Sequence, residues 1–158
     1  MITAIDHINI VVADLERSIK FYTELLGFKL IRTAHLQGDW IEQVVGLKNV
    51  SADVAYVIAP AGEPRIELLH YKSPPGQHVP ENSIANTRGL RHLAFRVKDI
   101  HPLVQRLKQA GVRLFGEPVT VPAGVVRHDA GDKTLIYFTD PDGVILELAE
   151  YSLNKDTE

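Results

Sequence analysis

The feature that most restricts the fold of this chain is an internal repeat in its sequence. When His7 is aligned with His92, Asp14 falls on Asp99, and each aspartate follows an apolar run typical of a strand. A helical pattern of apolar residues then follows each aspartate. Self-similarity of this kind indicates two structural units of one design, so we expect a fold assembled from two matching modules.

Each copy predicts a module with the element order βαβββ. We expect Asp14 and Asp99 to cap the two helices, and Gly27 and Gly111 to follow where the helices end. The strands expected after the helices cover residues 28–34, 52–58 and 66–71 in the first copy, and 112–115, 134–139 and 144–150 in the second.

The fold class that follows is α+β, with two paired βαβββ modules. A chain of 158 residues has the size of one ordinary domain, so we predict a single domain spanning residues 1–158. Its expected parts are module one over residues 1–71, a linker rich in Pro, Ser, Gln and Asn over 72–88, module two over 89–151 and a tail over 152–158.

Composition and charge exclude several classes of function. The net charge is −3 and no block of like charge stands out, so we do not expect nucleic acid as a partner. The absence of cysteine excludes disulfides, thiolate metal ligands and a cysteine nucleophile. No apolar run approaches the roughly 20 residues that a membrane helix needs, and no signal peptide is visible. We therefore expect a cytoplasmic protein without a membrane partner.

Two segments outside the repeated pattern are candidates for substrate contact. An insertion over residues 38–49 predicts a short helix, with Asp39 as its cap and a glutamate three residues later. We expect Trp40 on this helix to form a lid or an aromatic wall, or else to pack against a neighbouring subunit or the outer sheet. Residues 122–133 predict a loop, in which Arg127 either contacts substrate or is simply exposed.

Two histidines and two glutamates occupy equivalent places in the two modules. Because side chains alternate along a strand, His7 and His92 point away from the face that packs on the helix. The last strand of each module places Glu67 and Glu147 on that same side, each expected among aliphatic neighbours. His70 cannot share a face with Glu67 in a regular strand, and we favour Glu67.

The repetition of these polar groups favours a metal site. A single histidine in a strand is usually structural, and a single glutamate usually lies on a solvated face. Two of each at equivalent positions are hard to explain by coincidence. Two buried carboxylates would repel each other and would be costly to desolvate, whereas a divalent cation cancels their charge. We therefore predict one divalent metal ion as the cofactor.

With this pattern the chain resembles the vicinal oxygen chelate superfamily over residues 5–151. That superfamily includes glyoxalase I, methylmalonyl-CoA epimerase, extradiol dioxygenases and the fosfomycin or bleomycin resistance proteins. The resemblance implies a curved mixed sheet around a metal-binding cavity. It is compatible with Zn, Ni, Co, Mn or Fe(II), because ligand type alone does not choose between these metals. The implied ligands are His7, Glu67, His92 and Glu147.

Shorter motifs resemble two different members of the superfamily. RIELLHY followed by GLRHLAFRV resembles methylmalonyl-CoA epimerase, whereas FTDPDGVILEL resembles glyoxalase I. Arg88, four residues before His92, is placed like a glyoxalase arginine that holds the glutathione carboxylate, and so is a candidate for substrate binding. Two other positions that contact glutathione differ, since Val11 stands where glyoxalase has arginine and Tyr71 where it has asparagine.

The activity that the resemblance implies is proton abstraction next to a metal-bound carbonyl. The enzyme would be a lyase or isomerase of the glyoxalase type, acting on a small molecule or a thioester, with Glu147 as the first candidate for the base and Glu67 as the second. The alternatives are a methylmalonyl-CoA-type epimerase, an Fe(II) extradiol dioxygenase and a non-catalytic drug-binding resistance protein. The complete ligand set favours an enzyme, and four protein ligands leave little room for dioxygen chemistry. We expect a homodimer, with the site within one chain or across two.

Overall fold

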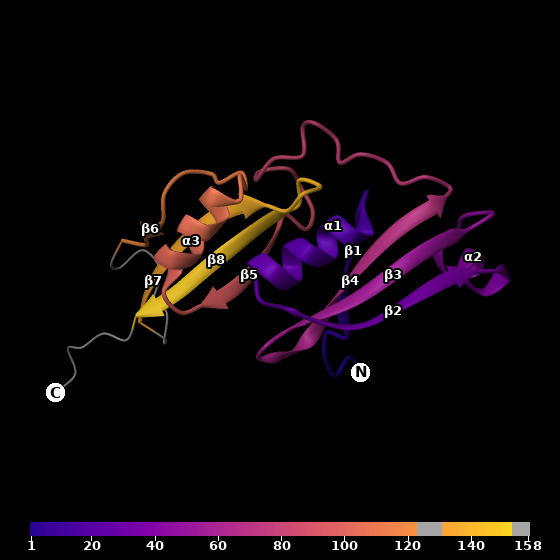
Figure 1. Ribbon diagram of the computed structural model, residues 1–158, viewed down its shortest axis with the longest axis horizontal. Coiled ribbons are helices and arrows are strands. Elements are labelled where there is room, and N and C mark those ends of the chain that lie inside the picture. Colours follow the sequence, from indigo (N-terminus) through magenta and orange to yellow (C-terminus); the bar gives the residue numbers. More distant parts are fainter. Residues whose placement is uncertain (123–130, 153–158) are drawn as a thin grey trace. The chain divides into compact units, whose positions relative to one another are not determined.

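The structure is a computed structural model that describes residues 1–122 and 131–152. It divides the chain into two compact units, Met1–His78 and Val79–Glu158. Figure 1 shows that each unit has its own twisted sheet with a helix lying across one face.

The first unit is built from strands, two α-helices and a π-helical turn. In chain order they are β1 (His7–Val11), α1 (Leu15–Lys20), the π-helical turn η1 (Phe21–Leu25), β2 (Lys29–Gln37), α2 (Asp39–Val45), β3 (Ser51–Ala59) and β4 (Gly62–Ser73). The strands form one mixed sheet in the order β1-β4-β3-β2, in which β1 runs parallel to β4 and the other neighbours are antiparallel.

The core of the first unit lies between this sheet and α1. Asp14 caps α1 as expected, because its carboxylate accepts a hydrogen bond from the Arg17 amide at 3.0 Å. Tyr22 on η1 is fully buried, as is Leu68 on the side of β4 that packs against α1. The hydrophobic face of the helix and alternate residues of the strands therefore form one core, and the other strand residues point to the opposite face of the sheet.

The second unit repeats this order with shorter connections. Its elements are β5 (His92–Val97), α3 (Ile100–Gln109), β6 (Val119–Thr120), β7 (Asp132–Thr139) and β8 (Ile145–Ser152). The sheet order is β5-β8-β7-β6, with β5 parallel to β8 and the other neighbours antiparallel. This is the same topology as in the first unit, so the predicted α+β fold of two βαβββ modules is confirmed.

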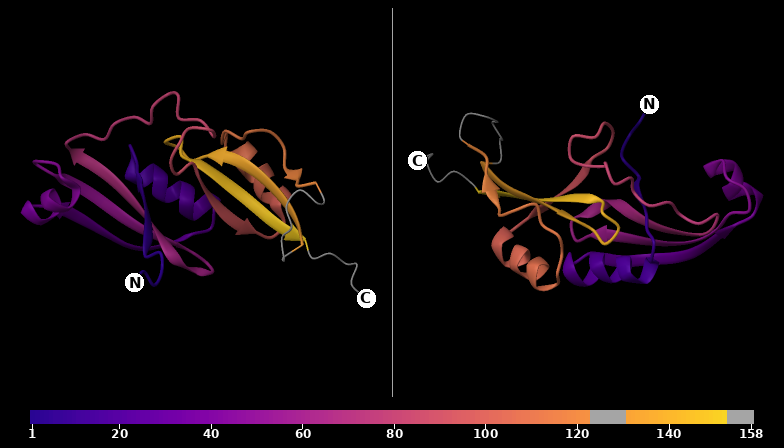
Figure 2. Two further views of the ribbon diagram at one scale, coloured as in Figure 1. Left: turned by 180° about the vertical axis from the view of Figure 1, so that it is seen from behind. Right: turned by 90° about the horizontal axis from the view of Figure 1, so that it is seen from above.

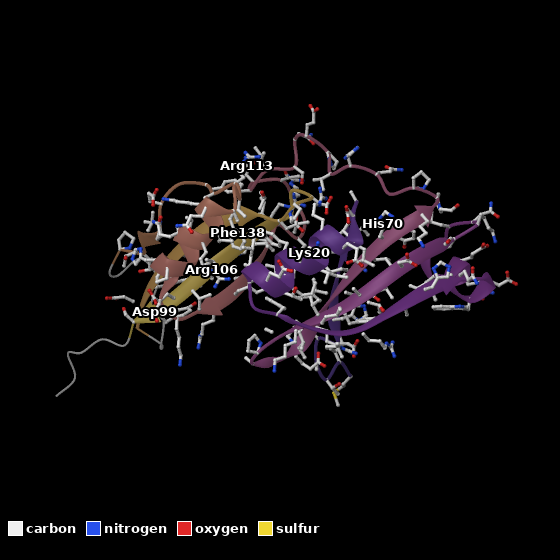
Figure 3. All side chains as sticks on the ribbon, in the orientation of Figure 1. Lys20, His70, Asp99, Arg106, Arg113 and Phe138 are labelled. Atoms are coloured by element: carbon white, nitrogen blue, oxygen red, sulfur yellow. The ribbon has the colours of Figure 1, made fainter. Side chains whose placement is uncertain are left out.

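The core of the second unit lies under α3, which covers one face of its own sheet (Figure 2). Val104 and Leu107 on α3 are buried, together with Phe138 on β7 and Leu146 on β8. Figure 3 shows Phe138 on this helix-covered part of the sheet. The polar residues expected on the opposite face are thereby separated from the core by the sheet itself.

Two helix caps differ from the expectation. Asp99 precedes α3 but makes no side-chain cap hydrogen bond, and its backbone has φ of 55°; the Ile100 amide donates instead to Glu150 Oε1 at 3.3 Å. For α2, the cap is Gly38 rather than Asp39, which is the first helical residue. At both helices the aspartate that the sequence predicts as the cap is therefore not the cap: Glu150 accepts the hydrogen bond at α3, and Gly38 is the cap residue of α2.

Two segments of the second unit also differ from the expectation. Residues 112–115 form an isolated bridge, Leu114 to Phe138, and the short strand follows later as β6. The loop predicted over residues 122–133 ends earlier, because β7 begins at Asp132 and includes Lys133. Residues 123–130, among them Arg127, lie outside the described residues.

The caps predict a difference in stability between two variants. Asp14→Ala should lower the free energy of unfolding by about 1 kcal/mol, because it removes the hydrogen bond to the Arg17 amide. Asp99→Gly is the matched control, and should leave stability unchanged or raise it, because Asp99 makes no cap hydrogen bond and glycine suits its positive φ. Urea denaturation followed by circular dichroism measures both, and equal losses would contradict the assignment of the caps.

No helix in the described part of the chain is long and apolar enough to cross a membrane.

Candidate functional site

In the first unit, His7 and Glu67 lie side by side on the sheet face opposite α1. Neighbouring strands β1 and β4 pair Asn9 with Glu67 and His7 with Arg65, so the side chains of His7 and Glu67 project from adjacent positions. His7 Nε2 lies 3.5 Å from Glu67 Oε2. The sheet thus brings one imidazole nitrogen and one carboxylate oxygen together from residues far apart in sequence.

The other ring nitrogen of His7 is held by Asp6. His7 Nδ1 lies 2.7 Å from Asp6 Oδ2, and Arg65 donates to Asp6 Oδ1 at 2.8 Å. The hydrogen bond with His7, and then the Arg65 charge, lower the pKa of Asp6 and keep it ionised. An ionised partner at Nδ1 favours the proton on that nitrogen, which leaves Nε2 with the lone pair that a metal ion needs.

Neutral donors hold the Glu67 carboxylate. Asn9 donates to Oε2 at 2.8 Å and the Tyr56 hydroxyl donates to Oε1 at 2.7 Å. Burial, followed by the hydrogen bond to Glu67 and then the Glu67 charge, raises the pKa of Tyr56, so this phenol remains protonated and able to donate. Both oxygens of Glu67 are therefore oriented by hydrogen bonds from its cross-strand neighbours.

The second unit repeats the pair with His92 and Glu147. Ala94 on β5 and Tyr137 on β7 pair with Glu147 as Asn9 and Tyr56 pair with Glu67. His92 Nε2 lies 3.2 Å from Glu147 Oε2, and the Tyr137 hydroxyl lies 3.3 Å from His92 Nδ1. Each unit therefore presents an Nε2 beside a glutamate oxygen, with a second group at Nδ1.

Among the described residues, Glu147 has a lysine within ion-pair distance, whereas Glu67 has neither a lysine nor an arginine there. Its side chain is 4% exposed, and Lys133 Nζ lies 2.6 Å from its Oε1. The contact is an ion pair between an ammonium and a carboxylate. Burial acts to lower the pKa of Lys133, but the adjacent Glu147 carboxylate outweighs burial and raises it, so the lysine remains charged.

The expectation that each carboxylate stands alone among aliphatic neighbours is wrong. Glu67 has Asn9 and Tyr56 as partners, and Glu147 has Lys133. These partners lie on other strands of the sheet. The alternation of side chains within a single strand does not predict which residues of other strands will lie beside it. Apolar side chains nevertheless share the face of Glu67, namely Ala34, Leu36, Ala52, Val54, Leu69 and Tyr71.

Three other residues considered in the sequence analysis lie outside the two His–Glu pairs. His70 lies on β4 (Figure 3), where its Nδ1 is 3.1 Å from the Val12 carbonyl oxygen, away from Glu67 as strand alternation requires. Trp40 on α2 is 56% exposed. Arg88 is exposed in the segment before β5.

Sequence reasoning missed several side chains around the two pairs: Asp6, Asn9, Tyr56, Tyr137 and Lys133. Strand alternation places Asn9 on the face of His7, which was an available signal. For Tyr56 and Tyr137 the signal would have been their matching positions in the middle strand of each module. Nothing in the sequence marked Lys133, because it stood at the end of a predicted loop.

The donor set fits a divalent metal, although neither pair suffices alone. Within residues 1–122 and 131–152 no group of three or more His, Asp or Glu side chains forms a metal site. Each pair offers one imidazole nitrogen and one carboxylate oxygen, which are donors that zinc and other first-row metals accept. The pairs therefore have the chemistry of half-sites, each with two ligands.

Comparison with known proteins gives a consistent result. Residues 4–148 match the family model described as Glyoxalase/Bleomycin resistance protein/Dioxygenase superfamily. A 2-epi-5-epi-valiolone epimerase from Actinomyces sp. is 31% identical, over 92% of this chain and 78% of its own. A probable lactoylglutathione lyase from Synechocystis sp. is 28% identical, over 95% and 97%. The crystal structure of a glyoxalase family protein from Bacillus cereus matches with a TM-score of 0.81 at 30% identity, over 96% and 95%.

Proposed function

The chain belongs to the glyoxalase/bleomycin resistance protein/dioxygenase superfamily, and from this we propose that it is a metal-dependent enzyme that removes a proton next to a carbonyl group. The observation that carries the proposal is the repeated His–Glu pair. Both pairs occupy equivalent register positions, with Nε2 to Oε2 distances of 3.5 and 3.2 Å. The proposed ligands are His7, Glu67, His92 and Glu147.

The proposed cofactor is one divalent ion, and the donors are compatible with Zn, Ni, Co, Mn or Fe. When bound, it would supply Lewis-acid stabilisation of negative charge on the substrate oxygen. Orientation of the ligands is the task of other side chains of the protein. Asp6 keeps His7 oriented through Nδ1, and the Tyr137 hydroxyl lies at the same ring atom of His92.

Glu147 is the better candidate for the base that takes the proton. Its side chain is almost fully buried, and a carboxylate excluded from water interacts strongly with nearby charge. Glu67 accepts hydrogen bonds at both oxygens, from Asn9 and Tyr56, and is therefore held more firmly in place. We therefore assign proton transfer to Glu147, and Glu67 is the second candidate for the base.

The proposed substrate is a small molecule with an acidic proton beside a carbonyl. The names of the relatives include an epimerase and a probable lactoylglutathione lyase, so both an epimerisation and a glyoxalase-type reaction lie within the proposal. Val11 and Tyr71 offer no guanidinium or amide for a glutathione conjugate, and this favours the epimerisation.

We also propose that the protein is a homodimer. Strands β1, β2, β5 and β6 are edges of their sheets and are able to pair with another chain. Light scattering, which measures the mass of the particle in solution, would test this proposal.

Proton exchange in D2O tests the reaction class directly. Metal-loaded protein is incubated with 2-hydroxycarbonyl compounds, hemithioacetals and acyl-CoA thioesters, and NMR follows the proton on the carbon beside the carbonyl. We expect that proton to be replaced by deuterium in one substrate class, and the exchange to stop when a chelator removes the metal. A protein that holds metal and binds a panel member without any exchange would instead support a binding role.

A further inference from the structure

The two equivalent glutamates differ in the charge of their partners. Glu67 is held by the neutral Asn9 amide and the neutral Tyr56 hydroxyl. Glu147 lies against the Lys133 ammonium at 2.6 Å. The two repeated modules therefore differ in the charge of the group that lies directly against the glutamate.

The asymmetry arises from one position in the sheet register. Lys133 on β7 pairs with Tyr151, four residues after Glu147. In the first unit the corresponding position is Ala52, which pairs with Tyr71, four residues after Glu67. The second unit therefore carries a lysine where the first has a methyl group.

The surroundings of Lys133 favour a lasting ion pair. The lysine side chain is 17% exposed and the Glu147 side chain 4%, so the two charges are poorly screened by water. The ammonium also lies 6.0 Å from the centre of the Tyr151 ring, whose face attracts a cation. Both contacts hold the ammonium close to Glu147 Oε1.

We propose that Lys133 is the resident counter-ion of Glu147 and makes it the weaker metal ligand of the two glutamates; this rests on the proposed function. A divalent ion that approaches Glu147 is repelled by the ammonium and competes with it for the carboxylate charge. Within residues 1–122 and 131–152 no lysine or arginine forms an ion pair with Glu67, so metal binding by Glu67 carries no such penalty. With a metal in the site, Glu147 would therefore be the more weakly held carboxylate and the one more available to take a proton, and Glu67 would be the firmer ligand.

The test measures the affinity of the metal-free protein for Zn²⁺ by isothermal titration calorimetry. Lys133→Met removes the charge while it keeps the length of the side chain, and should make Zn²⁺ binding roughly tenfold tighter. Lys133→Arg retains the charge and should bind Zn²⁺ as the wild type does. A merely structural role for Lys133 would give the opposite sign, because damage to the site weakens binding.

A matched control lies on the other face of the first sheet. Lys72 Nζ lies 2.6 Å from Asp53 Oδ2, so Lys72→Met breaks a lysine–carboxylate pair of the same length outside the site. It should leave Zn²⁺ affinity unchanged. A second control compares Glu67→Gln with Glu147→Gln in the Lys133→Met background, where no ammonium is left unpaired beside the site: the two losses of Zn²⁺ affinity should be similar.

The outcomes separate this inference from the proposed function. Unchanged or weaker Zn²⁺ binding by Lys133→Met, with normal binding by the wild type, overturns the inference alone. Clearly unequal losses for the two glutamine variants in the Lys133→Met background also overturn it. If neither the wild type nor Lys133→Met binds Zn²⁺, Ni²⁺ or Mn²⁺, the proposed metal site and the inference both fail.

Discussion

Glu147→Gln should lower the rate of proton exchange by at least about a hundredfold, because the amide cannot accept the proton that the carboxylate takes. The exchange assay in D2O gives the rate, and metal content per chain is measured on the same sample. Glutamine retains the size of the side chain and an oxygen donor, so the loss should appear in the rate even when the metal is present at saturating concentration.

The variant needs a control for stability, because it leaves Lys133 without its charged partner. A buried, unpaired ammonium is costly, so Glu147→Gln should also lower the free energy of unfolding. The double variant with Lys133→Met removes that charge and should recover stability without recovering the exchange rate. Asp53→Asn breaks the Lys72 pair outside the site and should leave the rate unchanged. A native rate in metal-loaded Glu147→Gln would show that Glu147 is not the base.

His7→Ala should weaken metal binding by roughly a hundredfold or more, because loss of a ligand exceeds the tenfold to hundredfold cost of losing a residue that only orients one. The His7 side chain is 41% exposed, so the folded protein should lose little stability. Calorimetry with Zn²⁺ measures the affinity, and thermal unfolding of the metal-free protein measures the stability.

His35→Ala is the matched control for this experiment. His35 Nδ1 lies 2.6 Å from Asp53 Oδ1, so it is another imidazole–carboxylate pair in the first unit, on the opposite face of the sheet from Ala34 and Leu36. Its removal should leave Zn²⁺ affinity unchanged. If His7→Ala and His35→Ala bind Zn²⁺ as tightly as the wild type, the proposed ligand set is wrong.

Much of the fold was accessible from the sequence because it depends on local patterns. The repeat predicts two βαβββ modules, and both sheets have the topology that this implies. The strands over residues 52–58 and 134–139 are found as β3 and β7, extended by one or two residues. Alternation also placed His7 and Glu67 on one face and His70 on the other. Their role as metal ligands stays a prediction.

The expectations that were wrong concern contacts between distant segments. Asp99 looks like a cap, but Glu150 from β8 supplies the hydrogen bond that the Ile100 amide makes. Residues 112–115 lie beside β7, where Arg113 and Phe115 make backbone hydrogen bonds and Leu114 forms a bridge, but this contact is too short to continue as a strand. In each case a partner far along the chain decided the local structure, and no local pattern identifies such a partner.

The sequence by itself determined the two modules, the faces of their strands and the four side chains that could act as ligands, because repetition and alternation are properties of consecutive residues. Only the tertiary structure decided what surrounds each carboxylate. Strand register placed Tyr56 and Asn9 beside Glu67, and Lys133 beside Glu147. Register is set when strands pair over long separations, so the asymmetry between two equivalent glutamates emerges only after the sheets have formed.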